Sequence, residues 1–325
     1  MKKISLKLLF SFIIILITII SCGKKKEEKI RIAAIKGPPA MGVVKLFSDN
    51  EEAKTLNKYD SKIVSTSDEI IALIGKEELD IATVPSNLAS VLYNKTEGKI
   101  QVASIIAFGI LYIVENEGNN LNTLKDLKGK TIYANGKGAT PEIVLKYILK
   151  GNGLEPGKDV KIEFKSEATE VINALSNDKK GVALLNQPFL TVAQSKNPKL
   201  RIAFSIEVEW DKIIKTNKGS QVSGVIIVNK NFAEKNPKKV ENFLKEYEQS
   251  VKFIKENSDE GAKLISKYGI IPEPIAKKAI LGTNITYVDG NEMKDKISKY
   301  LKILFEEDPK IIGGKIPKDD FYYIK

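Results

Sequence analysis

Short apolar runs alternate with helical patterns along most of this chain, and one arrangement occurs twice. Residues 31–35 and residues 131–134 are apolar and β-prone, which predicts two strands. A loop containing glycine follows each strand, and apolar residues with helical spacing follow each loop. The chain therefore contains two strand–loop–helix arrangements of the same kind.

A second matching pair extends each arrangement. Residues 80–88 and residues 181–189 each pass from an apolar strand into a proline-containing turn and then into a helix. A further predicted strand lies between the two members of each pair. The pattern thus predicts two β-loop-α-β-α-β units, at about residues 31–93 and 130–193.

Alternating strands and helices are typical of an α/β fold with parallel strands covered by helices. We expect two lobes, each a mostly parallel sheet flanked by helices, joined by two crossover strands. Ligands of open α/β sheets bind at the carboxyl ends of the strands. Two such sheets facing each other would place both sets of loops around one cleft.

The two predicted crossover strands contain or adjoin glycine. Residues 100–107 and 110–114 predict one strand that bends at Gly109 as it passes between the lobes. Residues 222–228 predict the return strand, with Gly224 inside it. We expect a hinge at Gly109, while Gly224 is equally consistent with a hinge or a simple bulge.

The crossovers divide the chain into a first lobe, residues 30–108 plus 225–325, and a second lobe, residues 109–224. Residues 207–218 predict a polar connection that holds Trp210, and residues 312–323 a loop with a closing strand. The remainder of the carboxyl-terminal part has helical spacing. The predicted helices are residues 237–255, 259–268, 273–279 and 292–305.

The start of the chain has the pattern of an export signal. Residues 1–21 combine a basic start with an apolar run and small closing residues, which predicts a signal peptide; an uncleaved membrane anchor is the alternative. Cys22 is the only cysteine, so no intramolecular disulfide is possible. Residues 22–29 predict a charged tether, and acyl chains on Cys22 would hold the protein at a membrane surface.

Composition excludes several classes of chemistry. The chain contains no histidine, which excludes Ser-His-Asp catalysis and histidine-based metal sites. The net charge is +11, but Arg31 and Arg201 are the only arginines, and the lysines are interspersed with acids. We therefore expect no nucleic-acid binding. The sequence predicts no metal site and no cofactor.

The loop after residues 131–134 is the strongest candidate for ligand contact. Thr140 is the predicted N-cap of the following helix, Pro141 suits its first position and Glu142 suits the helix dipole. Free backbone N–H groups of Gly138 to Thr140 would favour an anionic or electron-rich group. The alternative is that this glycine loop is simply a tight connection.

Several of these segments resemble one family. They are AIKGPPAMG at residues 34–42, DIATVPSNLASVLY at 80–93, LKDLKGKTIYANGKGAT at 124–140, residues 181–191 and the terminal GGKIPKDDFYY. With a lipobox-like Ile19-Ile20-Ser21-Cys22, the chain resembles periplasmic-binding-protein-like type II solute-binding lipoproteins of ABC transporters, in the SsuA-like group for sulfonate, taurine, nitrate and thiamine-pyrimidine uptake. Gln187 stands where that group often has glutamate, which removes a potential carboxylate.

The resemblance implies a monomeric, lipid-anchored receptor outside the cytoplasm that closes over a small molecule and delivers it to an ABC permease. Its ligand contacts would come from loop tips. Helix capping by Ser67 or Asp68 explains the first serine-containing segment equally well, and a capped helix start explains Ser86 and Asn87 equally well. Packing is the better explanation of Tyr112. The candidates are Lys36, Gly37, Met41, Ser65, Ser67, Ser86, Asn87, Tyr112, Asn135, Gly136, Gly138, Ala139, Thr140, Asn186 and Gln187.

Two other functions stay open from the sequence. One is a membrane-anchored enzyme that uses carboxylates, because acidic side chains can transfer protons without histidine. The other is an adhesion or scaffolding lipoprotein, which would bind no small ligand. The duplicated loop arrangement favours solute binding over both.

Overall fold

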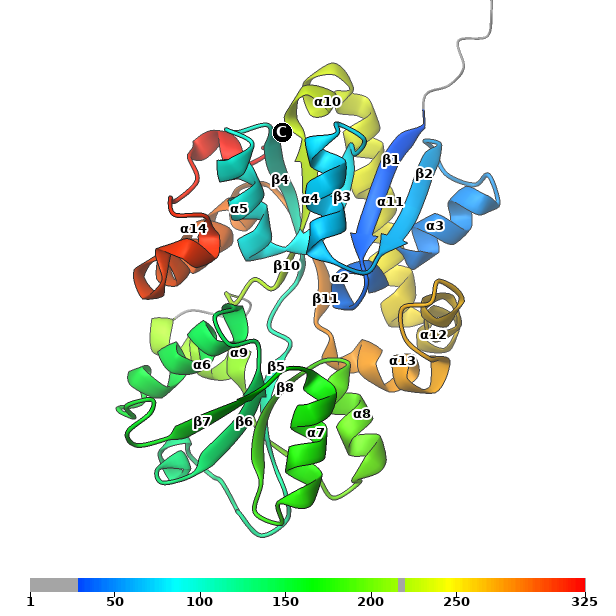
Figure 1. Ribbon diagram of the computed structural model, residues 1–325. Helices are drawn as coiled ribbons and strands as arrows, with labels where there is room; N and C mark the ends of the chain where they lie inside the picture. Colours follow the sequence, from blue (N-terminus) through cyan, green and yellow to red (C-terminus); the bar gives the residue numbers. More distant parts are fainter. Residues whose placement is uncertain (1–28, 216–219, 325) are drawn as a thin grey trace, which may run out of the picture.

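The computed structural model describes residues 29–215 and 220–324. It contains two separate sheets, each flanked by helices, one above the other in Figure 1. We call the upper body the first lobe and the lower, green body the second lobe. The predicted signal peptide, Cys22 and most of the predicted tether lie outside the described residues.

The two predicted units are confirmed, and they share one strand order. The first sheet has the order β11-β4-β10-β3-β1-β2 and the second β7-β6-β8-β5-β9. The first unit comprises β1 (Ile30–Ile35), α2 (Pro38–Met41), α3 (Val44–Glu51), β2 (Tyr59–Val64), α4 (Ser67–Gly75), β3 (Ile81–Pro85) and α5 (Ser86–Lys95). The second comprises β6 (Thr131–Asn135), α6 (Thr140–Gly151), β7 (Lys161–Lys165), α7 (Ala168–Asn177), β8 (Val182–Asn186) and α8 (Phe189–Lys196).

The crossover strands occupy equivalent places in the two sheets. β4 (Ile100–Ala107) leads out of the first sheet, and β5 (Leu111–Glu115) pairs antiparallel with β8 and with β9 (Arg201–Ser205). β10 (Gly224–Asn229) likewise pairs antiparallel with β3 and β4, and β11 (Ile285–Val288) with β4. Both sheets are therefore mixed, with β5, β10 and β11 running against the other strands.

The predicted polar connection around Trp210 is wrong, because residues there form α9 (Ile206–Ile214). Ile206, Trp210 and Ile213 lie on one face of this helix, since their spacing is close to helical. Trp210 is fully buried, and its ring lies 4.5 Å from Tyr147 of α6 and 5.4 Å from Tyr300. The charged residues between them made the segment read as a loop.

The predicted carboxyl-terminal helices are confirmed, but the predicted closing strand is not. Residues near the end form short 3₁₀ turns, and Tyr322 makes only an isolated bridge to Val102 of β4. The remaining elements are η1 (Leu124–Leu127), α10 (Lys230–Lys235), α11 (Pro237–Glu256), α12 (Ser258–Lys267), α13 (Glu273–Ala279), η2 (Ile280–Gly282), α14 (Gly290–Glu307), η3 (Pro309–Ile312) and η4 (Asp319–Phe321).

Helices cover both faces of the first sheet, which is typical of parallel strands that are apolar along most of their length. Alternate residues of β1 enter two apolar clusters: Ala33 packs in the cluster of α5 and α14, and Ile32 in that of α11. Phe243 and Tyr247 of α11 are fully buried there. Each large apolar side chain buried in this way contributes about 1.5–3 kcal/mol. No helix within the described ranges combines the length and apolar character that a membrane crossing needs.

Candidate functional site

A cavity of about 450 Å³ lies between the two sheets, and we call it the interlobe cavity. Its walls are the loops at the carboxyl ends of β1, β3, β6 and β8, with the two crossovers beside them. The lining residues come from both lobes: Ile35, Lys36, Pro38, Pro39, Ser67, Pro85, Ser86, Asn87, Leu88, Ile110, Leu111, Asn135, Ala139, Thr140, Pro141, Leu184, Asn186, Gln221, Val222, Ser223 and Tyr300.

The structure brings many of the sequence-predicted residues together around this cavity. Those that line it, from both lobes, are Lys36, Ser67, Ser86, Asn87, Asn135, Ala139, Thr140 and Asn186. They lie where strands end and helices begin, because the two repeated units place their loops at the same ends of their strands. Whether each of them contacts a ligand stays a prediction.

The other predicted residues lie outside the lining. Met41 is fully buried in the core of the first lobe. Tyr112 donates its hydroxyl to the Gly282 carbonyl at 2.9 Å, and the buried Gln187 accepts a hydrogen bond from Thr191 at 2.8 Å. The remaining ones lie within two residues of a lining residue in the sequence: Gly37, Ser65, Gly136 and Gly138.

The predicted caps of two helices are wrong. The cap of α4 is Thr66, not Ser67 or Asp68, and Thr66 forms a reciprocal capping box with Glu69. Since Ser67 is not needed as a cap, its hydroxyl is available at the cavity wall. The cap of α6 is Ala139, and Thr140 is the first helical residue.

The start of α6 is already occupied by a carboxylate from the chain itself. The Gly138 N–H donates to Glu142 Oε2 at 2.6 Å, and the Ala139 N–H donates to the Gly136 carbonyl at 3.0 Å. Burial favours the protonated form of Glu142, yet the Gly138 N–H and the Lys146 ammonium together hold its pKa below the ordinary value. Of the N–H groups expected to be free from Gly138 to Thr140, those of Gly138 and Ala139 are therefore already hydrogen-bonded within the protein. Whether the Thr140 N–H contacts an anionic or electron-rich group stays a prediction.

Side-chain amides remain free at this cavity. Asn135 at the end of β6 and Asn186 at the end of β8 are half-buried and, within the described chain, form no side-chain hydrogen bond. Gln221 is buried, and its side-chain oxygen lacks a partner among the described residues. A buried polar atom without a partner costs about 1–3 kcal/mol, so such groups favour a hydrogen-bonding guest.

Sequence reasoning missed the residues beside the crossovers. Ser223 precedes β10, and Tyr300 reaches the cavity from α14. The position of Ser223 at the start of the predicted return strand, residues 222–228, was a usable signal, because such strands run beneath the cleft. Tyr300 could not be identified as a cavity residue from the sequence, because its spacing in α14 is that of an ordinary core residue. Its contact with Trp210 couples the cavity wall to the only tryptophan of the chain.

The first crossover is tightly packed at Gly109. A Cβ atom there would lie 2.6 Å from Glu207 Cβ and 2.4 Å from Gln221 Oε1, so only glycine fits without rearrangement. Asn284 donates to the Gly109 carbonyl and to Glu207 Oε2, both at 2.8 Å. Burial, with the Asp211 carboxylate nearby, raises the pKa of Glu207 to about 7. Three separate chain segments thus meet at this crossover.

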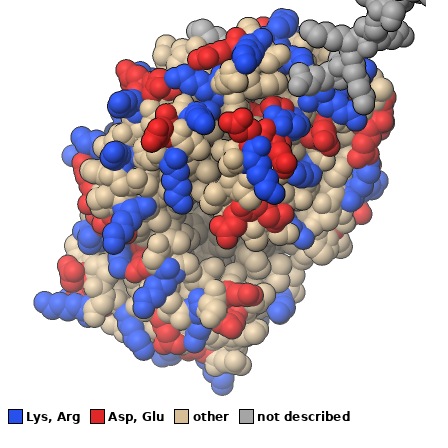
Figure 2. All heavy atoms as spheres, turned by 45° about the horizontal axis from the view of Figure 1, so that its top comes forward, with Lys and Arg blue, Asp and Glu red and all other residues tan. Residues whose placement is uncertain are grey.

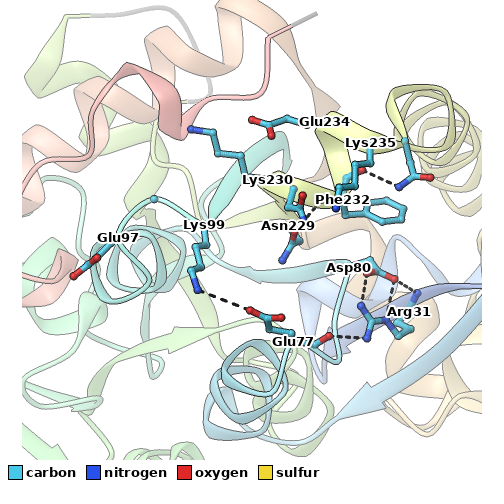
Figure 3. A pocket seen from close by; sticks show the side chains of 13 residues that line it. Arg31, Glu77, Asp80, Glu97, Lys99, Asn229, Lys230, Phe232, Glu234 and Lys235 are labelled. Atoms are coloured by element: carbon cyan, nitrogen blue, oxygen red, sulfur yellow. Dashed lines mark hydrogen bonds and ion pairs between the residues drawn. The ribbon is translucent and has the colours of Figure 1, made fainter.

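A second, larger cavity of about 710 Å³ lies at the opposite end of the first sheet, and we call it the distal pocket (Figure 3). It belongs to one lobe. Arg31 at the start of β1 donates to both carboxylate oxygens of Asp80, at 3.1 and 2.6 Å, and to the Glu77 carbonyl at 2.7 Å. Lys99 forms a long ion pair with Glu77. Two ion pairs thus join charged residues of the lining to one another.

Neither cavity has the donor set of a metal site. In the part of the chain that the structure describes, no three metal-ligating side chains cluster, and the sequence has no histidine. Lysine, arginine and acidic side chains are intermingled over the face shown in Figure 2. The carboxylate-based enzyme considered above would need an acid at the interlobe cavity, and the described lining contains none.

The fold matches solved solute-binding proteins. An ABC transporter structure from Parabacteroides distasonis is 24% identical, with a TM-score of 0.76, and the match covers 91% of this chain and 99% of that one. The periplasmic aliphatic sulphonate binding protein SsuA of Escherichia coli is 15% identical, with a TM-score of 0.69 and coverages of 90% and 92%. The alkanesulfonate-binding protein of Xanthomonas axonopodis, solved with MOPS, is 13% identical, with a TM-score of 0.62 and coverages of 89% and 94%. These similarities show the two-lobed fold.

Family membership comes from the sequence. A comparison with curated proteins found no match. A family model described as the periplasmic substrate-binding protein of a phosphonate ABC transporter matches residues 52–272, which is most of the chain. The predicted resemblance to ABC-transporter solute-binding proteins is thereby confirmed. This chain belongs to the phosphonate-type family of periplasmic substrate-binding proteins that serve ABC transporters.

Proposed function

We propose that this protein captures a small molecule in the interlobe cavity and delivers it to an ABC permease without changing it chemically. The observation that carries the proposal is that polar loop residues of both lobes, such as Asn87 and Asn186, line one cavity. A guest held by both lobes favours the arrangement in which the lobes are close, which is the usual closing motion of such receptors.

The hinge belongs to the same proposal. Gly109 lies between β4 and β5, and Gly224 begins β10, so each of them stands where the chain passes between the sheets. A few backbone residues at such positions can absorb the rotation of two rigid lobes. We place the lobe boundaries at these glycines, with residues 30–108 and 225–325 in the first lobe and 109–224 in the second.

We further propose that acyl chains on Cys22 hold a monomeric receptor on the outer side of the cell membrane. The short apolar leader and the charged tether support it, and the described chain starts at the edge of the first lobe (Figure 1). A Cys22→Ala chain is expected in the soluble fraction and the wild-type chain in the membrane fraction. Membrane retention of Cys22→Ala would contradict lipid anchoring.

Binding is tested by a thermal-shift screen across sulfonates, inorganic oxyanions, pyrimidines, flavins and amino acids. We expect at least one class to raise the midpoint of unfolding, because a ligand that binds only the folded state stabilises it. Trp210 provides a second readout, since it touches Tyr300 in the cavity wall. An enzyme would instead convert the compound that it binds. Absence of any midpoint or fluorescence change, also with a metabolite extract, would contradict the proposal.

A further inference from the structure

The helix α14 contributes one residue, Tyr300, to the described lining of the interlobe cavity. Contacts with the second lobe hold this helix in place. Lys150 of α6 forms an ion pair with Glu307 of α14 at 2.8 Å, and the ring centre of Tyr300 lies 5.4 Å from that of Trp210 in α9. Tyr300 therefore stands where the two lobes meet, with its ring fixed by packing.

The hydroxyl of Tyr300 faces the cavity without a partner. Only 2% of this residue is exposed, and its hydroxyl forms no hydrogen bond within the described chain. In the same described part, the side-chain polar atoms that are fully buried and lack a partner belong to Thr83, Trp210, Gln221 and Tyr247. The Tyr300 hydroxyl is not one of them, so it retains access to the space that Tyr300 lines.

Tyrosine hydroxyls elsewhere in the chain show how such a group is normally satisfied. Tyr112 donates to the Gly282 carbonyl at 2.9 Å, and Tyr287 donates to the Asp289 carboxylate at 2.7 Å. A buried aromatic ring that only packs could be phenylalanine, whereas a buried phenol normally has a hydrogen-bond partner. The partner that Tyr300 lacks is most simply supplied by a molecule in the cavity.

The chemistry of this hydroxyl is that of a hydrogen-bond donor. Burial disfavours the phenolate and raises the pKa of Tyr300, so the hydroxyl keeps its proton throughout the neutral range. A hydroxyl donates most strongly to an ionised oxygen. Ser67 and Thr140 line the same cavity, and neither their hydroxyls nor their backbone N–H groups have an acceptor in the described chain. Together with the positive charge of Lys36, these donors favour a ligand that presents several acceptor oxygens.

We infer that Tyr300 is a ligand-contact residue of the interlobe cavity, and that its hydroxyl donates a hydrogen bond to an anionic oxygen of the ligand, such as one of a phosphonate or a sulfonate. This inference rests on the proposed function of the cavity. It adds a donor from α14, in the first lobe, to the donors at the start of α6, in the second lobe. A ligand that accepts from both would bridge the two lobes.

The test removes the hydroxyl and keeps the ring. Tyr300→Phe is compared with Tyr247→Phe, because the Tyr247 hydroxyl also lacks a partner in the described chain but is fully buried in the core of the first lobe. Affinities for methylphosphonate, methanesulfonate, benzenesulfonate and inorganic phosphate are measured by thermal shift and calorimetric titration. We expect Tyr300→Phe to weaken the binding of at least one of these anions about tenfold or more, and Tyr247→Phe to leave it within about twofold. The midpoint of unfolding without ligand should stay the same in both variants, since neither loses a hydrogen bond within the protein.

A second comparison tests whether the acceptor is anionic. Methanesulfonamide, benzenesulfonamide and dimethyl methylphosphonate are uncharged counterparts of three of these anions. We expect the loss of affinity caused by Tyr300→Phe to be about threefold or more smaller for an uncharged compound than for its anion, because a hydrogen bond to a neutral acceptor is weaker. Binding of the anions alone would support the same conclusion. An equal loss for both members of a pair would show that the partner of Tyr300 is not the anionic oxygen.

Three results would overturn the inference as a whole. Unchanged affinity of Tyr300→Phe for every anion that binds would do so and leave the proposed function intact, because binding itself would persist. An equal loss in Tyr247→Phe would show a general effect of removing a hydroxyl. If no anion binds the wild-type protein at millimolar concentration, the inference fails, and the proposed function is then judged separately by the metabolite extract described above.

Discussion

The distal pocket and the interlobe cavity differ in how their polar groups are satisfied. The distal pocket is the larger of the two, yet Arg31 gives its donors to Asp80 and to the Glu77 carbonyl (Figure 3). The interlobe cavity is smaller, and it keeps the amides of Asn135 and Asn186 free within the described chain. The volume of a cavity is therefore a weaker indication of a ligand-binding site than the presence of polar side chains without a hydrogen-bond partner.

The two regions also differ in their position along the strands. Both involve β1, but the distal pocket lies at the start of β1, whereas the interlobe cavity lies where β1 and β3 end. The ends of parallel strands are where α/β folds bind ligands. Paired charges at the other end hold the strands in place, and we expect them to contribute to stability rather than to binding.

The largest effect is expected at the crossover beside the interlobe cavity. Gly109→Ala would push a methyl group against Glu207 and Gln221, and such overpacking costs about 3 kcal/mol of unfolding free energy. Chemical denaturation measures it. The matched control is Gly75→Ala at the end of α4, where nothing lies within 4 Å of the added atom. Equal stability of the two variants would show that the crossover is loosely packed.

A pH dependence is expected at the same crossover. The raised pKa of Glu207 means that the folded state holds its proton up to about pH 7, whereas the unfolded state loses it near 4.5. Stability should therefore fall by about 2–3 kcal/mol as the pH rises between these values, and stay level above them. The groups that face this carboxyl are Asp211, Asn284, Gly109 and Lys296.

Glu207→Gln should remove that fall, because an amide does not titrate. Denaturation curves of this variant and of the control Glu260→Gln, followed across the same pH range, separate Glu207 from the other carboxylates. A wild-type stability that rises between pH 4.5 and 7, or the same slope in Glu207→Gln, would show that another group dominates.

Ligand affinity should depend on the interlobe cavity alone. The Asn135→Ala, Asn186→Ala double variant loses two hydrogen bonds to the ligand, worth about 1 kcal/mol each, so affinity should fall about tenfold to a hundredfold. Asn231→Ala in the distal pocket is the matched control, since Asn231 is exposed there. Calorimetric titration with any compound found in the screen compares them. Equal losses in both proteins would remove the distinction between the cavities.

The smallest effect is expected in the distal pocket. Asp80→Asn weakens the hydrogen bonds from the Arg31 backbone and guanidinium, and it should lower the unfolding free energy by about 1–2 kcal/mol without changing ligand affinity. The partial exposure of Arg31 limits the loss. A change in ligand affinity with unchanged stability would mark the distal pocket as a second binding region.

The repeated pattern of the sequence was enough to predict the lobes and the place of the cavity. Strand–loop–helix order is local, and each copy supported the other, so residues such as Asn87, Asn135 and Asn186 could be assigned to one cleft. The sequence-based prediction for the segment that forms α9 failed for a local reason too. Charged residues between Ile206 and Trp210 masked an apolar face that only the packing of α6 and α14 against it makes evident.

The hydrogen-bond state of the loops could not be predicted. The glycines around Lys137 indicated free N–H groups, but the structure shows that Glu142 turns back to Gly138. Likewise, Gln221 and Tyr300 reach the cavity through contacts between segments far apart in sequence. Such contacts depend on the tertiary arrangement, and they decide which loop groups stay free to bind a ligand.

The central claim is that a small molecule is gripped between the two lobes. Small-angle X-ray scattering of the purified protein, with and without a saturating compound from the screen, tests it most directly. The account predicts that the bound protein has a smaller radius of gyration, and that the Asn135→Ala, Asn186→Ala variant needs more compound to contract. A bound protein of unchanged dimensions, with equal affinity in that variant, would contradict it.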